Sequence, residues 1–171
     1  NWAFDYSIDY AFNNLSSTLD TDAHPFRNTL LQSATAKFRT HRLTVMGRLL
    51  HSLYLNDAKQ GDAADDMRRL SPSLSISYQL LPQWHVRASY KEIFRAPTFN
   101  ENYFFHYGSK DLQPERTEQL NIGTTWQGDF GKTHVQTTLD SYYNWVKDMI
   151  VAVPFNMFVW NCVNVGKVRV Y

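Results

Sequence analysis

Residues 84–94 read WHVRASYKEIF, and apolar and polar side chains alternate strictly through the first eight of them. The apolar set is Trp84, Val86, Ala88 and Tyr90, and the polar set is His85, Arg87, Ser89 and Lys91. A period of two places the two sets on opposite faces of a β-strand. We therefore expect a strand with one apolar face and one polar face.

The same alternation recurs along the chain of 171 residues. The further segments are 1–10, 28–39, 42–55, 73–80, 118–126, 132–145 and 158–171. In the last segment the apolar parity changes near Gly166, which predicts a β-bulge there. The chain is expected to be all-β, with about eight antiparallel strands.

The connections between these segments alternate in length. Short ones lie at 40–41, 81–83 and 128–131, and long ones lie near 12–27, 56–69, 95–115 and 147–157. Short turns at one end and long loops at the other are typical of an up-and-down transmembrane β-barrel. The sequence has no run of about 18 apolar residues, so no transmembrane helix is expected.

Aromatic residues make up 15% of the chain, and on the apolar parity they gather at strand ends. One set lies beside the short turns (Phe38, Trp84, Trp126), and the other lies toward the long loops (Tyr10, Tyr90, Tyr143, Trp145). Two such belts match the interfacial girdles of a lipid-facing barrel. The alternative is the aromatic-rich core of a soluble β-sandwich.

Two phrases frame the long loop at 95–115. The first comprises Phe94, Arg95, Ala96, Pro97, Thr98, Asn100, Glu101 and Tyr103, and the second comprises Leu112, Pro114, Glu115 and Glu118. At this spacing the pair resembles the TonB-dependent outer-membrane receptors. Asn164, Gly166 and Lys167 resemble that family's next strand, so the likeness covers roughly residues 84–171.

The resemblance implies a non-enzymatic role in uptake across the bacterial outer membrane. Its partners would be outer-membrane lipid, a small scarce nutrient such as a ferric siderophore, cobalamin or haem, and the TonB complex acting through a plug domain. Barrels of this family have about 22 strands. Residues 1–171 are therefore expected to be part of a barrel without the plug domain, as an open curved sheet with 1–11 and 158–171 at its edges.

The motif residues have structural interpretations. Pro97 and Pro114 hold the preceding residues extended and donate no ladder hydrogen bond, so strand pairing should stop at each. Arg95 and Glu115 either pair across the mouth of the loop or remain two solvated charges.

Ligand contact is expected from aromatic residues in the long loops, which can stack on a flat ligand. The candidates are Tyr103, Phe104, Phe105, His106, Tyr107, Phe155, Phe158 and Trp160. The alternative is that these rings pack on one another and hold the loops closed.

Other chemistry is not indicated. The 17 basic and 16 acidic residues balance, which gives no argument for nucleic acid. The six histidines have no metal-ligand spacing, and there is no nucleophile elbow, so neither enzyme, metal nor cofactor is expected. Residues 57–66 resemble a calcium loop in composition only. Cys162 is expected to be a small buried apolar residue.

Two other classes remain open. One is a complete eight-stranded outer-membrane barrel with a structural or adhesive role. The other is a soluble all-β binding module. Hydrogen bonds between 1–11 and 158–171 would favour the complete barrel over a piece of a transporter.

Overall fold

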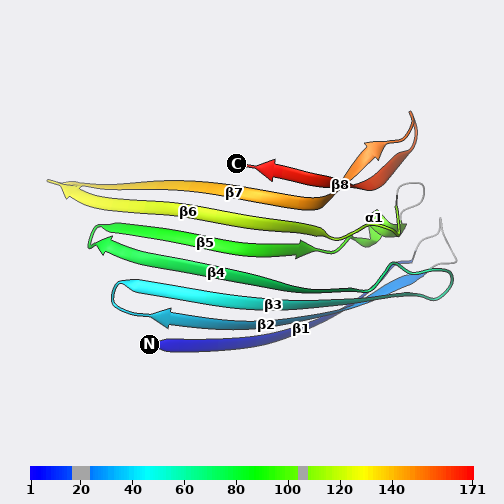
Figure 1. Ribbon diagram of the computed structural model, residues 1–171, viewed down its shortest axis with the longest axis horizontal. Helices are drawn as coiled ribbons and strands as arrows, with labels where there is room; N and C mark the ends of the chain where they lie inside the picture. The colour runs from blue at the N-terminus through cyan, green and yellow to red at the C-terminus, as the bar shows by residue number, and fades with distance from the viewer. Residues whose placement is uncertain (17–23, 104–107) are drawn as a thin grey trace.

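The computed structural model describes residues 1–16, 24–103 and 108–171, and their strands form one antiparallel sheet in chain order (Figure 1). The strands are β1 (Trp2–Asn14), β2 (Pro25–Arg39), β3 (Leu43–Ala58), β4 (Met67–Leu81), β5 (Trp84–Arg95), β6 (Glu115–Phe130), β7 (Thr133–Pro154) and β8 (Trp160–Val170). The one described helix, α1 (Phe99–Tyr103), follows β5. The expected all-β, up-and-down arrangement of eight strands is confirmed.

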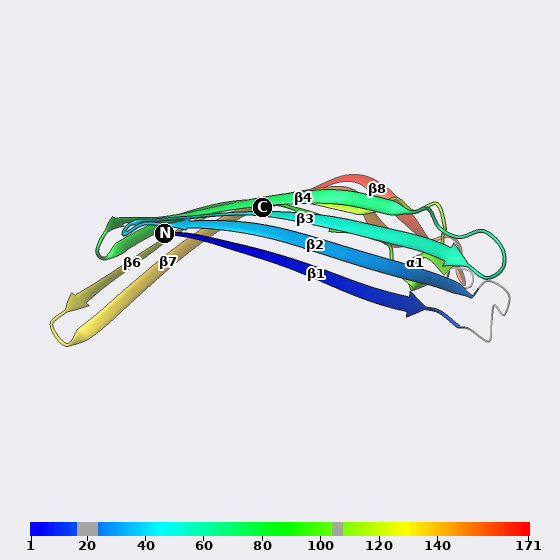
Figure 2. The ribbon, with the colours of Figure 1, turned by 90° about the horizontal axis from the view of Figure 1, so that it is seen from below.

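The sheet is open and curved. Figure 2 shows it as an arch, with β1 and β8 at opposite edges of the strand order. In the described part of the chain β1 pairs only with β2, and β8 pairs only with β7. The expected open sheet is confirmed, and the alternative of a self-closed eight-stranded barrel is wrong for this chain.

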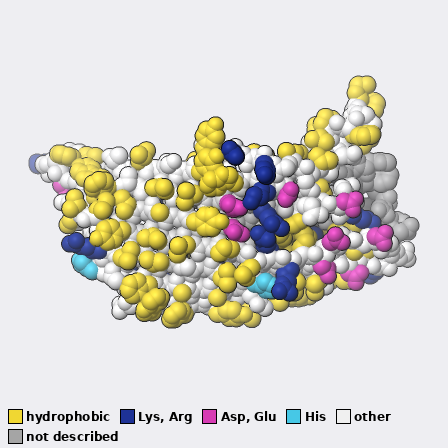
Figure 3. Space-filling model, in the orientation of Figure 1, with side chains coloured by type: hydrophobic (Ala, Val, Ile, Leu, Met, Phe, Trp, Pro, Cys, Tyr) yellow, Lys and Arg dark blue, Asp and Glu magenta, His cyan; other side chains and the backbone are white. Residues whose placement is uncertain are grey.

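The convex face of the arch is apolar. Ala88 lies directly opposite Ile76 on β4 and Ile122 on β6, so the apolar parity continues from strand to strand. Figure 3 shows this face with hydrophobic side chains across most of the strands. Phe4 and Leu139 are 74% and 70% exposed. A continuous apolar face of this size is a surface for lipid or a partner rather than for water.

The concave face is polar and partly covered by the loops. Ser33, Ser52 and Ser71 are buried there on neighbouring strands, as is Arg27. The division of faces read from the alternating sequence is therefore correct. No helix in residues 1–16, 24–103 and 108–171 is long and apolar enough to span a membrane.

Strands run further into the connections than expected. β6 continues to Phe130, so the short turn is Gly131 and Lys132, and Gly131 has the positive φ of 64° that such a turn requires. At the opposite end β7 continues to Pro154, which leaves only residues 155–159 as its loop. The expected loop at 147–157 is wrong because hairpin pairing with β8 extends almost to the tip.

The predicted bulge at Gly166 is also wrong. The pairing of β7 with β8 keeps one register from Asn144 opposite Val170 to Pro154 opposite Trp160. Backbone distortion lies instead across from Gly166, where Asp148 has a φ of 55°. The change of parity in the sequence therefore reflects a change of residue type on each face. The convex face carries the basic residues Lys167 and Arg169 in this part of β8.

Candidate functional site at the loop end of the sheet

Arg95 joins both ends of the longest loop. Its Nε donates to Glu115 Oε2 at 2.6 Å, and its Nη1 donates to the Glu101 carboxylate at 3.0 and 3.1 Å. Glu115 begins the strand that pairs with β5, and Glu101 lies in α1. The predicted pairing of Arg95 with Glu115 is confirmed, and Glu101 makes it a three-residue cluster.

Glu101 also organises the turn into α1. Its Oε2 accepts from the Thr98 backbone N–H at 2.7 Å and from Thr98 Oγ1 at 3.0 Å. Burial of Glu101 opposes ionisation, but the hydrogen bonds from Arg95 and Thr98 outweigh it and lower the pKa of its carboxyl. The carboxylate is thus the ionised centre on which the loop folds.

Arg27 ties this loop to a strand far away in the sequence. Its Nη1 donates to the carbonyl of Pro97 at 2.8 Å, and its Nε donates to Asn56 Oδ1 at 2.6 Å. The guanidinium also lies over the rings of Tyr54 and Phe99, 5.7 and 5.1 Å from their centroids. Sequence reasoning missed Arg27, because nothing local marks a contact across 70 residues.

The other motif residues make packing contacts or line the loop. Pro97 is fully buried beneath Arg27, and Leu112 packs in a buried cluster with Ile150 and Cys162. The expected burial of Cys162 is confirmed. Pairing stops at Arg95 and resumes at Glu115, as the two prolines predict. Phe94 and Pro114 line a polar cavity beside β4. Ala96 lies in the loop, and Asn100 lies in α1.

Asn164 connects the loop to β7 and β8. Its side chain accepts from the Gln113 N–H and donates to the Gln113 carbonyl, each at 2.8 Å. The same Nδ2 donates to the carbonyl of Asp148 at 2.7 Å, where the backbone is left-handed. Asn164, noted in the sequence only as part of a family phrase, therefore fixes the approach to β6.

Replacing Asn164 with leucine should free this approach. The Gln113 N–H lies at an exposed contact, so it exchanges its acceptor for water, and the net loss of one such hydrogen bond is about 0.5–1.5 kcal/mol. We expect hydrogen exchange at Gln113 to accelerate by about 3- to 10-fold. Asn144→Leu on the same strand pair is the control and should leave Gln113 unchanged. Equal protection of Gln113 in Asn164→Leu and in the unmodified protein would contradict the assignment.

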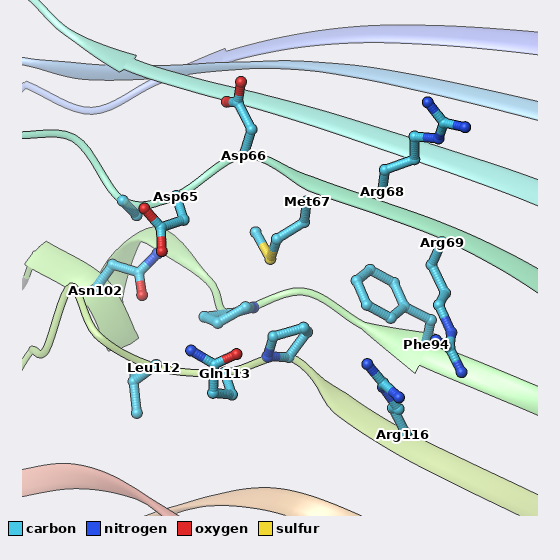
Figure 4. A pocket seen from close by; sticks show the side chains of 13 residues that line it. Asp65, Asp66, Met67, Arg68, Arg69, Phe94, Asn102, Leu112, Gln113 and Arg116 are labelled. Atoms are coloured by element: carbon cyan, nitrogen blue, oxygen red, sulfur yellow. The ribbon is translucent and has the colours of Figure 1, made fainter.

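A polar cavity of about 210 Å³ lies between the outer part of β4 and the loop (Figure 4). Charged and amide side chains surround it: Asp65, Asp66, Arg68, Arg69, Asn102, Gln113 and Arg116. Asn102 is 3% exposed, and both polar atoms of its side-chain amide lack a protein partner. The cavity exists because β4 and β5 pair only as far as Ser73 and Lys91, and separate beyond that point.

Tyr103, one of the ligand candidates, makes structural contacts. Its hydroxyl accepts from the Ala64 N–H at 2.8 Å, which ties α1 to the connection between β3 and β4. Its ring packs on Phe99, with centroids 6.0 Å apart. These contacts match the alternative in which loop aromatics hold loops together. The candidates Phe104, Phe105, His106 and Tyr107 lie outside the described residues.

The remaining candidates project from the tip between β7 and β8. Phe155 is 73% exposed, Phe158 is 88% exposed, and Trp160 is half exposed at the start of β8. Asn156 shapes the tip, since its Oδ1 accepts from the backbone N–H groups of Phe158 and Val159, each at 2.9 Å. The structure therefore presents these rings on an ordered turn.

The concave face carries a second, wider hollow of about 550 Å³. Arg87 donates to both oxygens of Asp140, at 2.6 and 2.8 Å, and lies among serines and amides from β4, β5 and β6. Gly123 lies on the strand between Arg87 and Asp140, directly opposite both residues. It leaves the space that their side chains fill, because a Cβ there would meet Asp140 Oδ1. A concave face lined by such polar side chains is typical of the interior of an outer-membrane barrel.

Comparison with known families decides what this sheet belongs to. Residues 4–171 match the family described as "TonB dependent receptor-like, beta-barrel". The chain belongs to the TonB-dependent receptor β-barrel family. Barrels of this family are outer-membrane proteins and are not enzymes, and the chain is part of such a barrel.

Individual relatives of this receptor segment are distant. It is 34% identical over 50 residues to the vitamin B12 transporter BtuB of Vibrio cholerae serotype O1, covering 29% of this chain and 8% of the transporter. The copper transporter OprC superposes with a TM-score of 0.79 at 15% identity, over 98% of this chain and 31% of OprC. The Serratia marcescens hemophore receptor HasR gives 0.71 at 14% identity, over 97% and 35%. The chain thus spans at most about a third of these proteins.

Proposed function

We propose that this chain forms part of the wall of a bacterial outer-membrane receptor that imports a scarce nutrient. The convex face would meet lipid, and the concave face would surround a plug domain contributed by sequence outside this chain. Energy would come from the TonB complex through that plug. Family membership, the apolar convex face and the polar hollow on the concave face support this arrangement.

The observation that carries the ligand assignment is the ordered tip between β7 and β8. Exposed aromatic rings at the end of a loop are unfavourable in water, and flat apolar faces recover that cost by stacking on a ligand. Phe155 and Phe158 are the proposed contacts, with Trp160 beside them. The relatives are named for vitamin B12, copper and a haem-carrying protein, which keeps cobalamin and haem in the proposed substrate class. A ferric siderophore stays in that class from the family resemblance alone.

Uptake of labelled cobalamin, ferric siderophore and haem by cells producing the complete receptor tests the proposal. One class should accumulate in cells with TonB and not in cells lacking it. Accumulation that is equal with and without TonB, for every class tested, would overturn the transport assignment.

Removing the tip rings should weaken capture of that ligand. We expect the double change Phe155→Ala and Phe158→Ala to raise the apparent Kd about 10-fold, since stacking contributes about 0.5–1.5 kcal/mol per ring. Phe130→Ala is the matched control, because Phe130 is 64% exposed at the opposite end of the sheet. Unchanged affinity in the double variant would remove the tip from the binding surface.

A further inference from the structure

The polar cavity between β4 and the loop has an acidic end and a basic end. Asp65 and Asn102 lie at one end, and Arg69 and Arg116 lie at the other (Figure 4). Arg69 makes one long ion contact, 3.5 Å from its Nη2 to Glu92 Oε2. Among the residues that the structure describes, Asp65 and Arg116 form no ion pair. Each end of the cavity therefore keeps a charge that a ligand of opposite charge can meet.

Apolar side chains complete the lining of this cavity. They are Met67, Phe94, Pro97, Leu112 and Pro114. Met67 is buried and lies between the two charged ends (Figure 4). A buried water needs two to four polar partners, which this apolar part of the lining does not supply. An occupant with charged ends and an apolar middle therefore matches the cavity better than water alone.

Asn102 gives independent evidence of an occupant. Its side chain is 3% exposed, and in the described part of the chain neither its Oδ1 nor its Nδ2 has a hydrogen-bond partner. The side chain extends from α1 toward the cavity (Figure 4). Buried amide groups in folded proteins are almost always hydrogen-bonded. A ligand that brings a donor and an acceptor to this end would satisfy both atoms.

From this geometry we propose that the cavity binds a zwitterion of dipeptide size with an apolar side chain. The ligand's ammonium group would lie between Asp65 and Asn102 Oδ1. Its carboxylate would accept from Arg69 and Arg116, and its peptide carbonyl would accept from Asn102 Nδ2. The apolar side chain would pack on Met67.

The spacing of the two ends sets the size of the ligand. Asp65 and Arg69 are four residues apart, which is at most about 13 Å between their Cα atoms. Side chains from both ends shorten this gap, and two peptide residues span about 7 Å. A single α-amino acid carries both charges on one carbon and cannot reach both ends. The cavity volume of about 210 Å³ limits the ligand to about the size of a dipeptide.

This site is separate from the aromatic tip between β7 and β8, and the proposal does not rest on the transport assignment. Asp65 and Arg69 border β4, whereas Asn102 and Arg116 belong to α1 and β6. A bound dipeptide would therefore tie the loop after β5 to β4, across the gap where these strands are not paired.

Calorimetric titration of the complete receptor with alanyl-leucine tests the site. Alanyl-leucine should bind about 10-fold more tightly than its N-acetyl derivative, its C-terminal amide or free leucine. Each derivative lacks one charge-assisted contact, and free leucine cannot span the cavity. No binding of alanyl-leucine, or equal binding of either blocked derivative, would overturn the proposal. This comparison needs no variant.

Two single variants locate the ends of the ligand. In Asp65→Asn the preference for alanyl-leucine over its N-acetyl derivative should fall at least 3-fold, while the preference over the C-terminal amide should stay. In Arg116→Gln the reverse should hold, because each change removes the partner of only one terminus. If both preferences kept their full size in both variants, the ligand would not lie between these residues.

The matched controls are Asp66→Asn and Arg68→Gln, which make the same charge changes one residue along the chain or on the same cavity wall. Both residues border the cavity, but their side chains point away from Met67 at its centre (Figure 4). Both control variants should keep the full affinity and both preferences. A loss of the same size in the controls as in Asp65→Asn and Arg116→Gln would overturn the site. Nutrient uptake should persist in all four variants, so failure here is distinguishable from failure of the transport assignment.

Discussion

Replacing Ile122 with arginine should cost about 2–4 kcal/mol of unfolding free energy in the receptor. Ile122 is 58% exposed on the convex face. It lies four residues from Trp126 and six from Arg116 along β6, which places it near the middle of the band that we propose faces lipid. A guanidinium there must leave water or distort the bilayer, and either is costly.

The matched control is Asn121→Arg, one residue away on the concave face. Asn121 lines the polar hollow, where a charged head can stay hydrated. We expect a cost below about 1 kcal/mol. Urea unfolding of the receptor in lipid vesicles measures both. A small cost at Ile122 together with a large cost at Asn121 would mean that the faces are assigned the wrong way round.

Removing the Glu115 carboxylate should have the next largest effect. Glu115→Ala deletes the acceptor for Arg95 Nε and also the acceptor for the Ile150 N–H, each at 2.6 Å. Breaking a buried charge pair costs about 3–5 kcal/mol. Because the Arg95 side chain is 39% exposed, solvent recovers part of this, and we expect about 2–3 kcal/mol.

Asp129→Ala is the control for Glu115→Ala. Asp129 also makes a short contact, from its Oδ1 to His134 Nδ1 at 2.7 Å, but both side chains are more than half exposed. Such a pair contributes about 0–1 kcal/mol. Unfolding in urea, followed by hydrogen exchange at Ile150, separates the two sites. If both variants lost the same stability, the Glu115 contacts would be no more than a surface ion pair.

The sheet could be predicted from the sequence because its information is local. Each strand repeats a period of two, and this repeat assigns a residue such as Ala88 to a face without knowledge of its neighbours. The strand ends at Arg95 and Glu115 were also predictable from local sequence. Pro97 and Pro114 lie beside them, and each proline holds the residue before it extended and donates no ladder hydrogen bond. The local pattern was misleading near Gly166, where basic residues replace apolar ones on the convex face. The sequence alone cannot distinguish this replacement from a β-bulge that moves the apolar residues to the other face.

The loop cluster was less predictable because its contacts are distant in sequence. Arg27 reaches Pro97 and Asn164 reaches Gln113, and no periodicity joins these pairs. Resemblance to the receptor family drew attention to Arg95 and Glu115 but not to Arg27. The aromatic ligand candidates lie in different surroundings, which composition does not reveal. The Tyr103 hydroxyl accepts a hydrogen bond from the Ala64 N–H, whereas the Phe158 side chain projects into solvent.

Labelling of single cysteines along β5, in the complete receptor in its native membrane with Cys162 replaced by serine, tests the central claim most directly. The claim is that this sheet is a barrel wall with its convex face in lipid. Cysteines at positions 85, 87 and 89 should react with a water-borne thiol reagent, and those at 86, 88 and 90 should be protected. Reaction at the second set with protection of the first would contradict the account.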